Sequence, residues 1–240
     1  MDRRVAGLAE LTAEIVACRR CPRLVAWREE VARVKVARFR DEEYWARPVP
    51  GFGDPAARLL IVGLAPAAHG GNRTGRVFTG DASGDFLFEA MHAVGLANQP
   101  VSRRADDGLA LIDAYVAAGV RCAPPANKPT PLERATCEPF LVRELSLLSD
   151  VRVLVALGAI AWASCFRVIA ALTGDDVRPQ PKFGHGVVAA AGGYTIVGSY
   201  HPSQRNTFTG KLSQPMLRAA LTTAVGLADR PDDRPRRIPA

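Results

Sequence analysis

A buried strand is expected to lead directly into a glycine-rich loop, and this pair of features constrains the fold most. The apolar run at 59–62 is typical of a buried strand, and residues 63–81 behind it contain five glycines. Glycine lets the backbone approach a ligand closely, while Asn72, Arg73, Arg76 and Phe78 supply hydrogen bonds, positive charge and an aromatic face. The segment predicts a loop, fixed at a strand end, that grips a flat, anionic ligand. A merely flexible surface loop is the alternative.

Apolar runs and stretches of helical periodicity alternate along the chain. We expect strands at 58–63, 114–121, 151–157 and 195–199, with a further strand or hairpin arm at 184–191. Helices are expected at 8–18, 83–94, 131–148, 159–172 and 211–227. The alternation indicates a single α/β domain around a central, mainly parallel sheet of four or five strands with helices on both faces.

In such sheets, ligands bind beyond the carboxyl ends of the strands. Three loops meet this description, at 65–81, 122–129 and 201–210, and we expect them to lie side by side. Thr130 and Glu133 match a capping box that starts the helix after the second loop. The remaining segments are interpreted as a charged, aromatic connector at 19–51 and, behind the domain at 1–228, a disordered tail at 229–240.

The charge of the chain favours a polyanionic partner. Its 240 residues carry a formal net charge of +7, and clustered basic residues release counterions when they meet phosphates, so nucleic acid is the first candidate. No apolar run reaches the roughly 20 residues of a membrane span, and the N-terminus lacks the apolar region of a secretory signal. We expect a cytoplasmic protein with no membrane partner, and we expect it to be a monomer.

Four of the five cysteines suggest a metal site. They occur as Cys18-x2-Cys21 and Cys122-x14-Cys137, and in a cytosolic chain such a set favours metal binding over a disulfide. Four thiolates suit either a structural zinc ion or an iron–sulfur cluster, and spacing does not decide between them. Unligated buried thiols are the alternative. Cys165 lies in an apolar helical stretch and is interpreted as a core residue.

Taken together, the motifs resemble those of the uracil-DNA glycosylase superfamily, and within it the fifth family, or type B. The order is the family's: Gly-Leu-Ala-Pro-Ala at 63–67, Gly-Asn-Arg-Thr-Gly-Arg-Val-Phe-Thr-Gly-Asp at 71–81, Arg-Cys-Ala-Pro-Pro at 121–125 and His-Pro-Ser at 201–203. The resemblance implies a compact parallel-sheet α/β fold and a [4Fe-4S] cluster on the four cysteines. It also implies hydrolytic excision of a deaminated or damaged base, usually uracil, from DNA.

A glycosylase must rotate its nucleotide out of the duplex, because the bond to be broken is inaccessible within the stack. Phe78 is the candidate to stack on the flipped base, unless it is a core residue beneath the loop. His201, at a strand end before Pro-Ser, is the candidate donor to the departing base. Backbone groups of the first motif are expected to contact base edges, and the residues concerned are Gly63, Leu64, Ala65 and Ala67.

The sequence departs from most of the superfamily at Ala65, where other families place the Asp or Asn that positions the attacking water. Asn72 is the favoured replacement as a water or substrate contact, and Asp81 is the other candidate, although Asp81 equally suits a helix cap. Ala118 stands where related iron–sulfur members carry a base-reading Asn, and Asn127 is the proposed substitute. The missing Asn at 118 and the family resemblance together predict relaxed discrimination, with hypoxanthine or ethenocytosine as further substrates besides uracil.

The expected partner is DNA that contains uracil or another deaminated base. The residues assigned to DNA contacts are Arg73, Ser203, Gln204, Arg205, Asn206 and Lys211. The main alternative is a noncatalytic nucleic-acid-binding protein whose cluster senses redox state. This alternative gives His201 and Phe78 no chemical function. A nucleotide-binding hydrolase is disfavoured, because no Gly-Lys-Ser or Gly-Lys-Thr follows in the loop.

Overall fold

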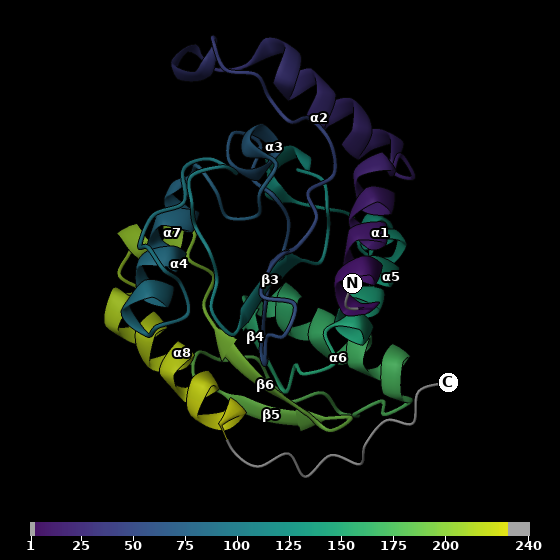
Figure 1. Cartoon of the computed structure of the whole chain (residues 1–240), viewed down its shortest axis with the longest axis vertical. Coiled ribbons are helices and arrows are strands. Elements are labelled where there is room, and N and C mark those ends of the chain that lie inside the picture. Colours follow the sequence, from purple (N-terminus) through teal and green to yellow (C-terminus); the bar gives the residue numbers. More distant parts are fainter. Residues whose placement is uncertain (1–2, 230–240) are drawn as a thin grey trace.

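A computed structural model describes residues 3–229 as an α/β domain built on one six-stranded sheet (Figure 1). The strand order is β1-β3-β2-β4-β6-β5. The four central strands pair in parallel, and both edge strands are antiparallel to their neighbours. The strands are β1 (Phe52–Gly53), β2 (Leu59–Gly63), β3 (Ala114–Ala118), β4 (Val153–Leu157), β5 (Val188–Ala191) and β6 (Tyr194–Ser199).

The mainly parallel sheet confirms the predicted fold class, although the strand number is higher than expected. The arm at 184–191 joins the sheet as β5, an antiparallel partner of β6. Gly192 and Gly193 connect the two strands, and both have positive φ, as a two-residue hairpin turn requires. The sixth strand, β1, is only two residues long and was not predicted.

Helices cover both faces of the sheet, as expected (Figure 1). Alternate residues of β2 enter two separate cores, because side chains along a strand point to opposite faces. Leu59 and Ile61 pack on the side of α4 and α8, and Leu60 and Val62 on the side of α5 and α6. The longer helices are α1 (Arg3–Ala17), α2 (Pro22–Val34), α4 (Ala82–Ala93), α5 (Pro131–Leu147), α6 (Ala159–Thr173) and α8 (Gln214–Ala228).

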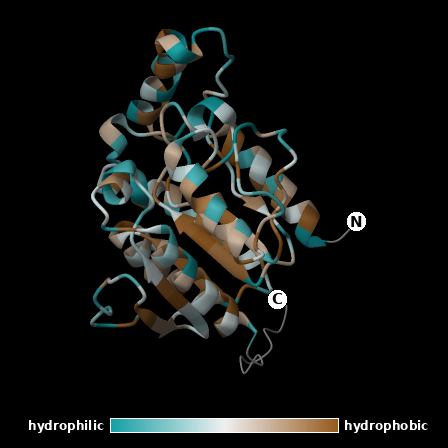
Figure 2. Ribbon diagram, turned by 90° about the vertical axis from the view of Figure 1, so that its left-hand side faces the viewer, coloured by the Kyte–Doolittle hydropathy of each residue, from teal (hydrophilic) through white to brown (hydrophobic). Residues whose placement is uncertain are grey.

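Four shorter helical segments lie in the connections. They are η1 (Ala37–Phe39), α3 (Gly71–Thr74), η2 (Pro125–Asn127) and α7 (Gln204–Phe208). The sheet itself is strongly apolar and is enclosed by helices whose polar residues alternate with apolar ones (Figure 2). No helix within residues 3–229 is long and apolar enough to cross a membrane.

The interpretation of 19–51 as a connector is wrong over its first half, which forms α2. Pro22 stands in the first turn of this helix, where proline is well tolerated. Leu24 and Val31 are buried on one face, and Arg28 lies between them with only 2% of its surface exposed. A charged residue at a buried position interrupts the apolar pattern from which the helix would have been predicted.

The start of α5 was predicted correctly, whereas α1 begins at Arg3, five residues before the expected start. The Thr130 hydroxyl accepts from the Glu133 amide, and the Glu133 carboxylate accepts from the Thr130 amide, which completes the capping box. The last helix begins at Gln214 rather than near 211, with Ser213 as its cap. Asp229, the first residue of the expected disordered tail, forms an ion pair with Arg58 at 2.8 Å, and the rest of that tail lies outside the described residues.

A buried ion pair fixes the chain directly after β3. Arg121 and Glu144 of α5 bond at 2.5 Å, and the side chains are 1% and 2% exposed. The Arg121 amide also donates to the Cys137 sulfur at 3.3 Å. Removing one partner of such a pair typically costs about 3–5 kcal/mol, because the other charge is left buried and unpaired. The pair therefore locks the second loop onto α5.

Candidate active site

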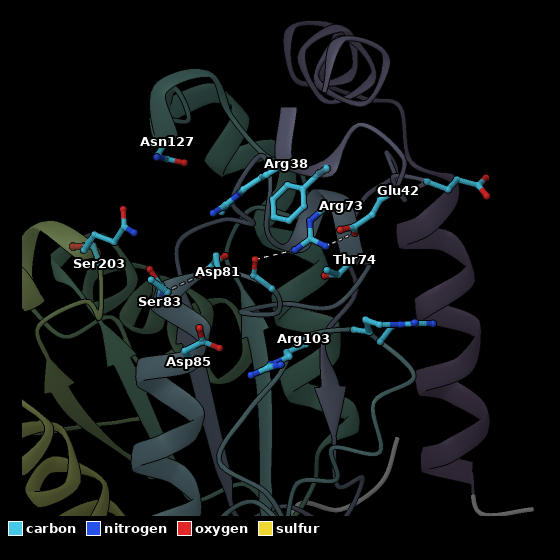
Figure 3. A pocket seen from close by; sticks show the side chains of 18 of the residues that line it. Arg38, Glu42, Arg73, Thr74, Asp81, Ser83, Asp85, Arg103, Asn127 and Ser203 are labelled. Carbon is cyan, nitrogen blue, oxygen red and sulfur yellow. Dashed lines mark hydrogen bonds and ion pairs between the residues drawn. The ribbon is translucent and has the colours of Figure 1, made fainter. Parts of the chain in front are cut away.

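The three predicted loops meet at a pocket of about 290 Å³ beside the carboxyl end of the sheet. Five of its lining residues also line a wider groove of about 1240 Å³, which opens the pocket to the surface (Figure 3). The pocket is lined by Leu64, Ala65, Pro66, Ala67, Phe78, Asp81, Ser83, Asn127, His201 and Ser203. The first, second and third loops all contribute, so the expected convergence is found.

Phe78 and His201 lie together in the pocket lining. Their ring centroids are 5.8 Å apart and the ring planes are inclined by 34°. Phe78 is 8% exposed, so it is packed against the core and also borders the pocket. A side chain at Gly63 would place its Cβ 2.7 Å from the Phe78 ring. Gly63 therefore makes room for Phe78, whereas it was expected to make room for a base.

His201 sits directly after β6, and burial lowers the pKa of its imidazole to about 4. The ring is thus neutral near pH 7, with one nitrogen that donates and one that accepts. The Asn206 side-chain amide donates to the His201 carbonyl oxygen at 2.9 Å. This bond fixes the backbone of the third loop. Asn206 does not line the groove, and its contact with DNA stays a prediction.

Asp81 caps α4 and also lines the pocket, whereas its predicted contact with water or substrate stays a prediction. Its Oδ1 accepts from the amides of Ser83 and Gly84 at the start of α4, while Oδ2 has no bond to any described residue. Burial raises the pKa of the Asp81 carboxyl, against the opposing effect of these two amides. A Cβ at Gly70 would stand 1.9 Å from Oδ2. The absence of a side chain at residue 70 therefore leaves room for Oδ2 of Asp81.

Asn127 reaches both the pocket and the groove from the second loop. Its φ is +55°, in the left-handed region that asparagine tolerates better than most residues. Ala126 before it is also left-handed, at +52°. Pro124 and Pro125 restrict the backbone on the approach to this turn. The second loop therefore places Asn127 in the pocket lining, and its role in base reading stays a prediction.

Asn72 does not lie in the pocket. Its side chain is fully buried, and its Nδ2 donates to the Arg28 carbonyl oxygen of α2 at 3.2 Å. Asn72 is absent from the lining of the pocket and of the groove. The placement does not support the predicted contact with water or substrate. The loop turns into α3 at this point, which directs Asn72 toward α2.

Arg73 is also occupied by the protein itself. Its guanidinium donates to the carbonyl oxygens of His69 and Gly80 and to the Glu42 carboxylate, and it lies 3.8 Å from the centroid of the Phe39 ring. With 7% of its surface exposed, Arg73 braces the loop. Three of its five N–H donors are thus bonded within the protein, while Arg73 also lines the groove, so its phosphate contact stays a prediction.

Some of the other residues predicted to contact DNA lie in the groove. Ser203, Gln204 and Arg205 line it, whereas Lys211 does not and instead lies 4.8 Å from the centroid of the Tyr200 ring. Sequence reasoning missed three further basic residues of the lining, Arg38, Arg103 and Arg104. The doublet Arg103-Arg104 lies in a segment without strand or helix periodicity, and this pattern could have indicated basic residues in a surface loop.

The four predicted cysteines share one small cavity of about 20 Å³. Among the described residues, no three metal-binding side chains are disposed to hold a single metal ion. Burial raises the pKa of Cys122 to about 11 and that of Cys137 to about 12, so that both are neutral thiols when nothing is bound. Cys165 is fully buried in α6, as expected of a core residue.

Arg28 supplies a test of whether these thiols suit a metal centre. Its guanidinium donates to the Cys122 sulfur at 2.9 Å and to the Cys18 carbonyl oxygen at 3.3 and 3.4 Å. Within the described part of the chain it has no bond to a carboxylate. A buried cation without an anion is costly, and a metal centre held by four thiolates is anionic. The donor set and its neighbour therefore fit such a centre better than unligated thiols.

Comparisons with known proteins agree with this geometry. A sequence model of the uracil-DNA glycosylase superfamily matches residues 50–224. A type-5 uracil-DNA glycosylase of Mycobacterium tuberculosis is 56% identical over 88% of this chain and 78% of its own. One of Thermus thermophilus is 53% identical over 89% of this chain and 95% of its own. One of Pyrobaculum aerophilum is 45% identical over 88% of each chain.

The low pKa of His201 predicts a loss of stability in acid. The folded pKa of about 4 lies below the ordinary value of 6.5, so the unfolded chain binds more protons between these values. His201 makes its full contribution to the free energy of unfolding above pH 6.5. This contribution, up to roughly 3 kcal/mol, is lost as the pH falls toward 4. Denaturant unfolding at pH 7 and 4.5 should show a larger decrease for the wild type than for His201→Gln. An equal decrease in both would contradict the assignment.

Proposed function

The chain belongs to the uracil-DNA glycosylase superfamily, and we propose that it excises uracil from DNA by hydrolysing the N-glycosidic bond. One observation carries the proposal. An aromatic ring, a neutral imidazole and a carboxylate with a free oxygen line one pocket, and this pocket opens into a groove whose lining includes five arginines. Each supplies a function that base excision needs.

The pocket receives the everted base. Phe78 presents an aromatic surface, and base–aromatic stacking is worth about 1–3 kcal/mol in single-strand binders. The backbone of residues 64–67 borders the same space and offers hydrogen-bonding groups to base edges. As the bond breaks, negative charge develops on the base, and a preorganised donor at its oxygen lowers the barrier. His201 is that donor, because it is neutral at physiological pH and fixed at the end of β6.

Asp81 acts on the other side of the broken bond. Ala65 offers no carboxylate or amide side chain, and Asn72 is buried away from the pocket. The free Oδ2 of Asp81 is positioned to accept a proton from the attacking water and to stabilise positive charge on the sugar. The capping bonds at Oδ1 hold the carboxylate in place during both tasks.

The groove binds the strand that carries the lesion. Gln204 and Arg205 line it on the side of the third loop, and Arg38 and Arg103 contribute positive charge elsewhere in the lining. Arg104 is paired with Asp106 at 2.8 Å and contributes less. Contacts of these types position a protein on the DNA backbone without reading sequence. The groove thus supports binding of DNA, with uracil selected by the pocket.

The cofactor proposed for the four cysteines is a [4Fe-4S] cluster with a structural role. Cys18 follows α1, Cys21 caps α2, Cys122 belongs to the second loop and Cys137 to α5. A cluster, when bound, supplies a cross-link among these segments. Four cysteine thiolates are the usual ligands of such a cluster.

The pocket also supports a broad substrate range. Ala118 is buried at the end of β3 and brings no amide to the pocket, so Asn127 is the amide side chain of the lining. We extend the proposal to hypoxanthine and ethenocytosine, and to a cytoplasmic monomer.

Replacing Asp81 tests the reaction itself. Asp81→Asn keeps an oxygen that caps α4 but removes the acceptor for the proton of water, so kcat on a uracil-containing duplex should fall by about 10²- to 10⁴-fold. The measurement is strand breakage by alkali after incubation. Asp85→Asn, one turn further along the groove, is the matched control and should retain near-normal activity. Uracil-specific binding without base release by the wild type would favour the noncatalytic alternative.

Replacing Asn127 tests base recognition. Asn127→Gly keeps the left-handed backbone and removes the amide, so kcat/KM on uracil should fall by roughly 3- to 10-fold, as expected for one lost hydrogen bond. The wild type and the variant are compared on duplexes with a single uracil, hypoxanthine or ethenocytosine. Unchanged kinetics on all three would remove Asn127 from the pocket's recognition groups.

Metal analysis tests the cofactor. Protein purified without oxygen should be brown and contain iron and sulfide in the ratio of the cluster, and Cys137→Ser should lose both. Cys165→Ser, which changes a buried thiol outside the cysteine cavity, is the control and should keep its iron. A colourless, zinc-loaded protein would contradict the cluster.

A further inference from the structure

Arg28 connects the cysteine site to the glycine-rich loop. Its side chain binds the cysteine site through the Cys122 sulfur and the Cys18 carbonyl oxygen. Its main-chain oxygen accepts from Asn72 of the first loop at 3.2 Å. Both Arg28 and Asn72 are buried, at 2% and 0% exposure. A single residue of α2 therefore contacts both regions.

The link continues to the pocket wall. The Asn72 amide donates to the Ala67 carbonyl oxygen at 3.1 Å, and Ala67 lines both the pocket and the groove. The Asn72 carbonyl oxygen accepts from the Ala46 amide at 3.0 Å. Since Oδ1 of Asn72 is buried without a partner among the described residues, its bond to Arg28 is the one side-chain bond that holds this residue to α2.

A second connection runs along the chain from the same cysteine site. Cys122, the sulfur that Arg28 contacts, is five residues before Asn127. The intervening Pro124 and Pro125 stiffen the segment. A shift of Cys122 is thus transmitted to the pocket on two sides, at Ala67 and at Asn127.

We propose that Arg28 is a positioning residue that couples the state of the cysteine site to the shape of the base pocket. When thiolates of a metal centre neutralise its guanidinium, Arg28 is held and its carbonyl oxygen keeps Asn72, and hence the Ala67 wall, in place. When the centre is lost, the buried cation has no anion, α2 shifts and the wall relaxes. The coupling rests on the proposed function, because its second site is the pocket for the everted base.

Coupling of this kind is reciprocal. If an intact centre favours base binding, a bound base must stabilise the centre by the same factor, which for linked sites is typically 5- to 150-fold. The part of the structure that would change between the held and the relaxed state consists of Arg28, Asn72 and Ala67. Occupation of the pocket is therefore expected to slow the loss of the metal centre.

The test measures how fast a chelator bleaches the visible absorbance of the intact protein. The probe is a duplex with one 2′-fluoro-2′-deoxyuridine, which resists cleavage, and the same duplex with thymidine serves as reference. At saturation, the uracil analogue should slow bleaching of the wild type at least fivefold. Asn72→Leu, which keeps the volume but removes the donor, should load its iron and bind the analogue, yet show less than twofold protection.

Asn98→Ala is the matched control, because it removes an asparagine bond to a backbone oxygen, at Gly108, away from both sites. It should keep full protection. Full protection in Asn72→Leu would overturn the proposal, since it would mean that DNA merely shields the cysteine site. Asn72→Ala gives the same comparison if the Leu variant does not fold. If the wild-type protein contains no iron, the coupling is also overturned. If the wild type binds the uracil-analogue duplex and the thymidine duplex equally well, the proposed function is overturned instead.

Discussion

The carboxyl ends of the parallel strands lie along one edge of the sheet, and every part of the site depends on this arrangement. The first loop leaves β2, the second follows β3, and His201 follows β6. Segments that are far apart in the chain are thereby brought around one pocket. The absence of a side chain at Gly63 lets the Phe78 ring lie against the end of β2. Strand register thus determines the position of the ring, the imidazole and the carboxylate together.

Burial controls the charges around this edge. It keeps His201 neutral and raises the pKa of the Asp81 carboxyl. The same low polarity makes unpaired charges costly, which explains why Arg73 and Arg121 are each engaged by a carboxylate. Arg28 is the exception among these buried arginines, and its nearest groups are the sulfur and backbone oxygen of the cysteine site. The charge of Arg28 therefore links the fold to the proposed cofactor.

Local signals predicted much of the fold. The apolar runs became the parallel strands, and the capping box at Thr130 is present. The helix α2 was missed because Arg28 occupies a buried position, where an apolar residue is normally expected. The loops that form the pocket were identified from their place after strands. Their individual side chains were harder to place, because Asn72 and Arg73 are oriented by partners that lie elsewhere in the chain, Arg28 and Glu42.

In the proposed function, one pocket holds an everted uracil between Phe78, His201 and Asp81. The most direct measurement is a crystal structure with a duplex that contains 2′-fluoro-2′-deoxyuridine. We expect the base to lie against the Phe78 ring, with a His201 nitrogen about 2.7–3.1 Å from a uracil oxygen and Asp81 facing the sugar. A uracil that remains stacked in the duplex, or that binds outside this pocket, would contradict the account.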